Sequence, residues 1–146
     1  MVMLEPTRGP STCNSLKELY ELANQLDIPA DLLTESLYTA LDFDKQYILF
    51  YLCPESRELY KVGVLVRLCF GLEDIYGYEL VGFVVTGDCD QYKDLHVDKL
   101  TYVYMDNVKG KCVVIVNEKP KDLFVEGKYR WCYQLLNDIR EVREYL

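Results

Sequence analysis

The fold of this protein is decided by residues 47–53, Tyr-Ile-Leu-Phe-Tyr-Leu-Cys. Apolar and aromatic residues follow one another there without a polar break, which is typical of a strand covered on both faces. After the polar turn 54–58, residues 60–70 alternate, with Tyr60, Val62, Val64, Val66, Leu68 and Phe70 on one side. We therefore predict a central strand, followed by a strand that packs one face on the core and leaves the other partly wet.

Further strands are predicted downstream. The alternation stops at residues 71–77 and resumes over 78–86, where Gly82 indicates a bulge or a close approach of two backbones. Residues 100–105 and 111–117 form two more strands, joined by a hairpin loop rich in Asp, Asn and Gly. Because the links are too short for parallel crossovers, we expect an antiparallel sheet of about five strands, mostly a meander.

Helices are predicted at both ends of the chain. Ser15 and Glu18 form a capping box that opens a helix over 15–26. Asp27 is predicted to cap a second helix, which has Pro29 in its first turn and ends near Asp42. A C-terminal amphipathic helix is predicted from a stripe made of Trp131, Leu135, Ile139, Val142 and Leu146. The fold class is α+β, with a flexible segment 1–13 before a single domain, 14–146.

The composition of the chain indicates which binding partners and which cellular compartments to expect. Of the 146 residues, 16 are basic and 24 are acidic, and the resulting charge of -8 argues against non-specific nucleic-acid binding. No long apolar run or signal-peptide pattern is present, which predicts an intracellular protein, cytoplasmic or nuclear, that is neither secreted nor bound to a membrane. The six Cys contain no C-x-x-C pair and are expected to be buried thiols.

Sites for catalysis are scarce in this sequence. His96 is the single His, and it lies in the polar segment 87–99. One hypothesis pairs it with Cys89 as nucleophile and base, and another places it with Asp88, Asp90 and Asp94 around a metal. No His-x-x-x-His, zinc-type Cys pair, phosphate-binding glycine loop or G-x-S-x-G elbow occurs. We therefore predict a solvated acidic loop there, with no metal and no cofactor.

The leading hypothesis for function is a noncatalytic protein-interaction module, such as an inhibitor, antagonist or adaptor of the viral or bacterial-immunity type. The 13 Tyr and the acidic charge predict a Tyr-rich surface that binds a protein with a basic surface. The residues predicted to form this surface are Tyr76, Tyr78, Asp88, Asp90, Tyr92 and Asp94. Alternatives are a small-molecule or nucleotide pocket lined by Gly82 and the aromatic strands, and the His96 enzyme. Homodimerisation is compatible with each hypothesis.

Overall fold

The computed structural model describes residues 13–53, 62–92, 100–106, 110–119 and 130–145. Within these residues, the helices α1 and α2 precede most of the strands, and the 3-10 helices η1 and η4 occur later. In chain order the elements are β1 Asn14–Ser15, α1 Leu16–Gln25, α2 Ala30–Asp42, β2 Tyr47–Leu52, β3 Val62–Phe70, β4 Ile75–Asp88, η1 Cys89–Tyr92, β5 Leu100–Asp106, β6 Lys111–Val116, β7 Trp131–Leu136 and η4 Ile139–Tyr145.

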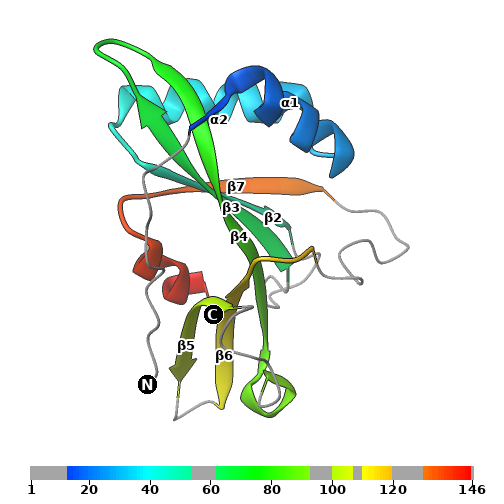
Figure 1. Cartoon of the computed structure of the whole chain (residues 1–146). Helices are drawn as coiled ribbons and strands as arrows, with labels where there is room; N and C mark the ends of the chain where they lie inside the picture. The colour runs from blue at the N-terminus through cyan, green and yellow to red at the C-terminus, as the bar shows by residue number, and fades with distance from the viewer. Residues whose placement is uncertain (1–12, 54–61, 93–99, 107–109, 120–129, 146) are drawn as a thin grey trace.

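The strands form one antiparallel sheet in the order β5-β6-β4-β3-β2-β7, with the short β1 added to β4. The prediction of an α+β fold with two N-terminal helices and an antiparallel sheet is therefore confirmed. Strand β2 pairs with β3 on one side and β7 on the other, so it is an internal strand of the sheet, as predicted. In Figure 1 the helices lie at one end of the twisted sheet and the β5–β6 hairpin at the other.

The predicted C-terminal helix is wrong. Residues 131–136 form β7, which pairs with β2 along its whole length, and only a 3-10 helix follows. The stripe at helical spacing was ambiguous because Trp131, Tyr133 and Leu135 also alternate, and these three side chains pack on the helix-covered core. Pairing with β2 favours the strand conformation for residues 131–136, since the apolar strand β2 would otherwise be left with an unpaired edge.

Hydrophobic clusters cover both faces of the sheet. The larger one packs α1 and α2 on one face, through residues such as Leu33, Phe50 and Val66. The second lies on the other face and includes Leu65, from β3, and Val142, from η4. The second face of β3 is thus less exposed to solvent than the alternating sequence predicted, because η4 and its neighbours pack on it.

Three local predictions can be compared with the backbone. The register of β3 and β4 shifts between Leu65 and Val66, opposite Gly82 and Leu80, so the predicted bulge is confirmed. The Ser15 hydroxyl accepts a hydrogen bond from the Glu18 amide at 3.2 Å, as the capping box requires. Asp27 does not cap α2, because it has a left-handed backbone with φ of 59° and the N-cap position is held by Pro29.

All six cysteines form disulfides, which contradicts the prediction of free thiols. The pairs are Cys13–Cys69, Cys53–Cys132 and Cys89–Cys112, with Cα–Cα distances of 6.4, 5.5 and 4.9 Å. Three disulfides in a domain of this size are typical of extracellular and secreted proteins, which fold in oxidising compartments. The predicted cytoplasmic or nuclear location is therefore wrong.

No helix in the described part of the chain has the length and apolar character needed to cross a membrane.

Candidate functional site

The structure separates the residues that the sequence grouped into one surface. Tyr76 and Tyr78 lie near the start of β4, whereas Asp88 ends that strand and Asp90 lies in η1. Twelve residues at about 3.3 Å each place Tyr76 and Asp88 roughly 40 Å apart along the strand. The side chain of Tyr92, the residue Asp94 and the predicted catalytic His96 lie outside the described residues. Among the predicted residues whose side chains are described, Tyr76 and Tyr78 therefore lie far along β4 from Asp88 and Asp90.

The acidic end of β4 offers little chemistry in the described part of the chain. Cys89 is bonded to Cys112, so its sulfur is not present as the thiolate that the nucleophile hypothesis needs. The Cys89 amide donates to the carbonyl of Gly110, which closes this end of the strand pair. Among the described residues, no three His, Cys, Asp or Glu side chains are arranged to hold a metal ion.

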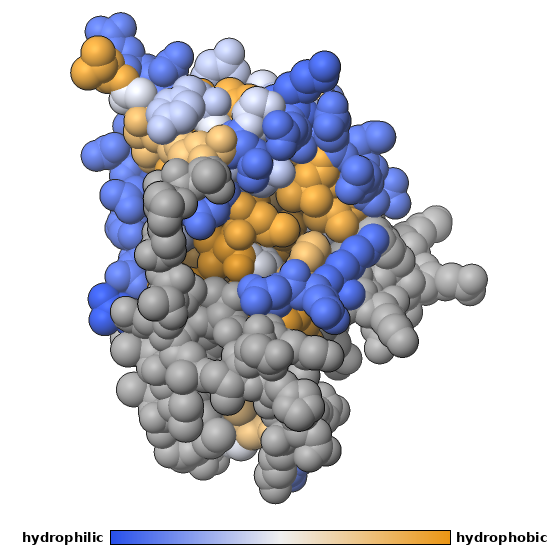
Figure 2. Space-filling model, in the orientation of Figure 1, coloured by the Kyte–Doolittle hydropathy of each residue, from blue (hydrophilic) through white to orange (hydrophobic). Residues whose placement is uncertain are grey.

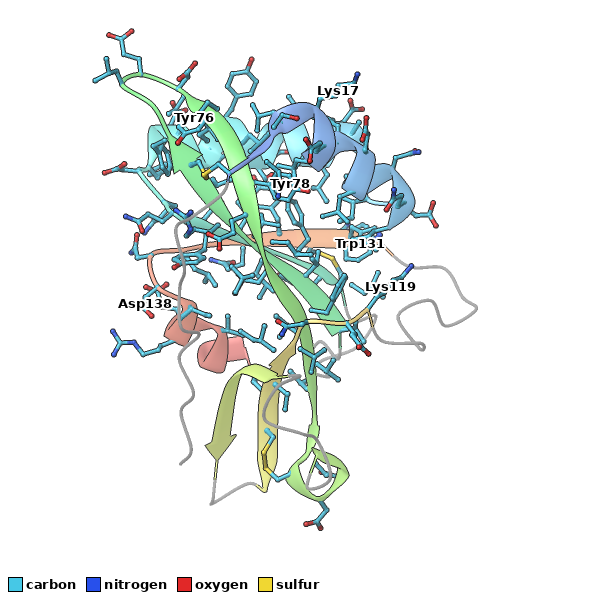
Figure 3. The ribbon with its side chains drawn as sticks, in the orientation of Figure 1. Lys17, Tyr76, Tyr78, Lys119, Trp131 and Asp138 are labelled. Atoms are coloured by element: carbon cyan, nitrogen blue, oxygen red, sulfur yellow. A yellow bond between two sulfur atoms is a disulfide. The ribbon has the colours of Figure 1, made fainter. Side chains whose placement is uncertain are left out.

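Tyr78 belongs to the core and not to a binding surface. Its side chain is 6% exposed and packs in the helix-covered cluster, and Figure 3 shows it beneath α1. Burial raises the pKa of the Tyr78 phenol, and the charges of Glu18 and Glu21 raise it further. The neutral phenol is therefore the form that the folded state stabilises.

This pKa shift predicts a specific loss of stability at high pH. Above pH 10.0, the ordinary pKa, the unfolded chain loses the Tyr78 proton before the folded chain does, so the free energy of unfolding falls as pH rises. Tyr78→Phe should therefore lose less stability than the wild type between pH 8 and pH 11, as measured by urea unfolding. Tyr76→Phe, from the same strand but exposed, is the control substitution in the same measurement. An equally steep loss in Tyr78→Phe would contradict this role of burial.

Large apolar side chains are exposed on α2, on the residue that follows it and on the β3–β4 hairpin. The four most exposed in the described part of the chain are Tyr38 at 68%, Phe43 at 68%, Leu72 at 104% and Tyr76 at 56%. We call these four residues the hairpin surface. Figure 1 shows the hairpin projecting beside the end of α2, and Figure 2 shows its apolar tip among hydrophilic side chains.

The backbone around the hairpin surface is held by several contacts. Residues Asn14 and Ser15 pair with Tyr78 and Gly77, and the Cys13–Cys69 disulfide joins the same segment to β3. The Gly71 amide donates to the Asp74 carbonyl at 2.7 Å and closes the turn. At the other side, the Gln46 carbonyl accepts from the Leu68 amide, which ties the chain after α2 to β3. The surface is therefore presented by a rigid support.

The charges beside the hairpin surface are mostly negative. Residues 38–46 and 71–76 carry the four exposed carboxylates of Asp42, Asp44, Glu73 and Asp74, against the single half-buried Lys45. Aromatic and apolar side chains framed by carboxylates suit a partner that has an apolar pocket with basic residues around it.

Sequence reasoning found only Tyr76 of the hairpin surface. Tyr38 lies on the face of α2 opposite the buried Ser36 and Ala40, and Phe43 directly follows the helix. Leu72 stands in the turn Gly71–Asp74, where a large apolar residue has no core to enter. An apolar residue off the helical stripe or inside a polar turn was the signal that could have located these positions.

Comparisons with known proteins identify no relative. No protein-family model, no curated protein and no solved structure matches this chain.

Proposed function

We propose that this protein is a disulfide-stabilised, noncatalytic protein-binding module, an inhibitor, antagonist or adaptor, and that the hairpin surface is where its partner binds. The observation that carries the proposal is that Tyr38, Phe43, Leu72 and Tyr76 are exposed on α2, just after it and on the β3–β4 hairpin, elements that Figure 1 shows at the same end of the molecule. Exposed apolar groups of this kind mark binding sites in soluble proteins, and Tyr and Phe are enriched in protein interfaces. The partner proposed is a protein with a basic surface.

The support of the surface also favours binding. A partner loses less free energy to ordering when the side chains it contacts are already held in place. The Cys13–Cys69 disulfide and the pairing of β1 with β4 supply that support directly beneath Tyr76. The proposal keeps the acidic, Tyr-rich character expected from the sequence and moves its centre from Asp88 and Asp90 to the hairpin.

Photocrosslinking tests the proposed function. A photoreactive amino acid at Leu72 should label a protein in the extracellular fraction of the source organism or its host. Unlabelled wild-type chain should compete for that label, and Leu72→Glu should compete at least about tenfold less well, since burying an unpaired charge costs more than 1.4 kcal/mol. Because Leu72 is fully exposed, Leu72→Glu should leave the unfolding free energy within about 0.5 kcal/mol of wild type.

The matched control places the same photoreactive group at Glu118, which is exposed in the stretch that follows β6. It should give no label that the wild-type chain competes away. Equal labelling from both positions, or full competition by Leu72→Glu, would contradict the hairpin surface as the binding site.

A small-ligand pocket is the second candidate. Figure 2 shows apolar surface in a recess between α1 and residues 117–119, which is the observation that favours it. A pocket of this kind binds through burial of apolar area with few polar contacts. Native mass spectrometry separates the two candidates, since a pocket protein retains a copurified molecule that is released on unfolding.

A further inference from the structure

Two side chains donate hydrogen bonds to the sulfur atoms of the Cys13–Cys69 disulfide. The Nη2 atom of Arg67 lies 3.8 Å from Cys69 Sγ and 4.0 Å from Cys13 Sγ. The Tyr76 hydroxyl lies 3.9 Å from Cys13 Sγ. Among the described residues, the hydrogen bonds to sulfur all belong to this disulfide. Figure 3 shows the corresponding S–S bond beside Tyr76, at the base of the hairpin.

The guanidinium is held in position by a carboxylate. Arg67 Nε and Nη2 both lie 2.8 Å from Glu79 Oε2 on the neighbouring strand. The side chain of Arg67 is 18% exposed, so its charge is less screened by water than that of a surface arginine. Glu79 thus fixes where the positive charge lies and also offsets part of it.

The two sulfur atoms differ in access. Cys69 is 3% exposed within β3, whereas Cys13 is half-buried at the start of the described chain. Because Cys13 is the more exposed of the two residues, we expect an external thiolate to attack Cys13 Sγ, and the sulfur of Cys69 to leave. A cation beside the leaving sulfur stabilises the thiolate that forms and so speeds thiol–disulfide exchange.

We propose that Cys13–Cys69 is a site of thiol–disulfide exchange, attacked at Cys13 by a small thiol or by a dithiol reductase. The attacking thiolate forms a new S–S bond with Cys13, and the electrons of the broken bond go to Cys69, which leaves as a thiolate beside Arg67. With a dithiol, the second thiol then attacks the mixed disulfide and releases Cys13 as a thiolate. The dithiol is oxidised to a disulfide while Cys13 and Cys69 take up its two electrons.

The fold is expected to survive this exchange. Strand β1 stays paired with β4 through Asn14 and Ser15, and Ser15 still caps α1. The modified site is thus a local change beneath Tyr76, while the sheet and both helices remain in place.

Glutathione is the probe for this proposal. The native full chain is incubated with reduced glutathione, free thiols are trapped by alkylation at successive times, and each cysteine is located by peptide mass spectrometry. Glutathione is expected on Cys13, with Cys69 as the free thiol. Glutathione on Cys69 with Cys13 free would overturn the proposed direction of attack.

Two charge variants give opposite expected results. Arg67→Gln removes the cation and should slow exchange at Cys13–Cys69, because a thiolate that is no longer stabilised by a neighbouring cation leaves more slowly. Glu79→Gln removes the offsetting carboxylate and should speed exchange, and Arg67→Lys should keep a rate close to wild type. If the ion pair acted only by holding the strands together, both neutral variants would speed exchange, and that result would overturn the proposal.

The Cys53–Cys132 disulfide is the internal control in every sample. Its reduction rate should be the same in the three variants, which shows that they remain folded. A change at Cys53–Cys132 equal to the change at Cys13–Cys69 would mean general opening of the chain and would also overturn the proposal.

Discussion

Replacing Cys53 and Cys132 together by Ala is expected to lower the free energy of unfolding by about 4.5 kcal/mol. This disulfide joins residues 79 positions apart, and closing a loop of that length removes much of the entropy of the unfolded chain. It joins the end of β2 to the start of β7, where the Cys53 amide also donates to the Arg130 carbonyl at 2.8 Å. Since the total free energy of unfolding of a small domain is only about 5–15 kcal/mol, the variant should be close to unfolding at 37 °C.

Urea unfolding followed by Trp131 fluorescence measures this loss. Trp131 is the only tryptophan, it is 8% exposed and it precedes Cys132, so its emission reports on the pairing of β7. The matched control replaces Cys89 and Cys112 by Ala. Their separation of 23 positions predicts a smaller loss of about 3.5 kcal/mol. A loss under about 1 kcal/mol for the Cys53–Cys132 pair, or a larger loss for the shorter loop, would show that loop closure is not the main contribution.

Gly82→Ala is the second substitution with a large expected effect, a loss of about 3 kcal/mol or more. A Cβ atom at Gly82 would lie 2.6 Å from Ile115 Cγ2 and 2.7 Å from the Val116 carbonyl oxygen. Both atoms belong to β6, and Ile115 is fully buried in the second hydrophobic cluster. The added methyl group therefore forces β4 and β6 apart, because a strand backbone cannot move away as a side chain can.

Gly110→Ala serves as the control for Gly82→Ala. A Cβ atom at Gly110 meets nothing within 4 Å, but the backbone there has φ of 68°. That conformation costs a non-glycine residue about 1 kcal/mol, without any steric overlap. Thermal unfolding of both variants should therefore show the larger drop in melting temperature for Gly82→Ala. An equal drop in the two variants would contradict the close approach of β4 and β6.

The elements predicted correctly are those whose signal is local. The Ser15 cap, the two helices, the apolar strand β2 and the bulge at Gly82 each depend on residues near in sequence. Strand β7 was missed because Trp131, Leu135 and Ile139 fit a helical spacing, and a partner some 80 residues earlier decides between the two structures. Tertiary pairing overrides a local pattern when an apolar strand such as β2 needs a second neighbour.

The disulfides and the candidate site could not be predicted from the sequence for a related reason. The paired cysteines are 56, 79 and 23 positions apart, and strand register is what brings them together. For example, Cys132 pairs with Tyr51 in the sheet, and Cys53 follows two residues later, just after the paired strand ends at Leu52. This register brings Cys53 close to Cys132. Likewise, the chain that follows α2 and holds Phe43 is joined to β3, which precedes Leu72, by the hydrogen bond between Leu68 and Gln46. Neither the cysteine pairing nor the approach of these segments can be recognised from residues that are close in sequence.

The position of β7 has a consequence for how the chain is made. Cys53 leaves the ribosome 79 residues before Cys132, which at roughly 5–20 residues per second is about 4–16 s. During that interval Cys69, Cys89 and Cys112 emerge, so the Cys13–Cys69 and Cys89–Cys112 pairs are complete, while Cys53 has no native partner and β2 lacks one neighbour. Any wrong bond that Cys53 forms then has to be exchanged, so the yield of native protein depends on disulfide isomerisation late in synthesis.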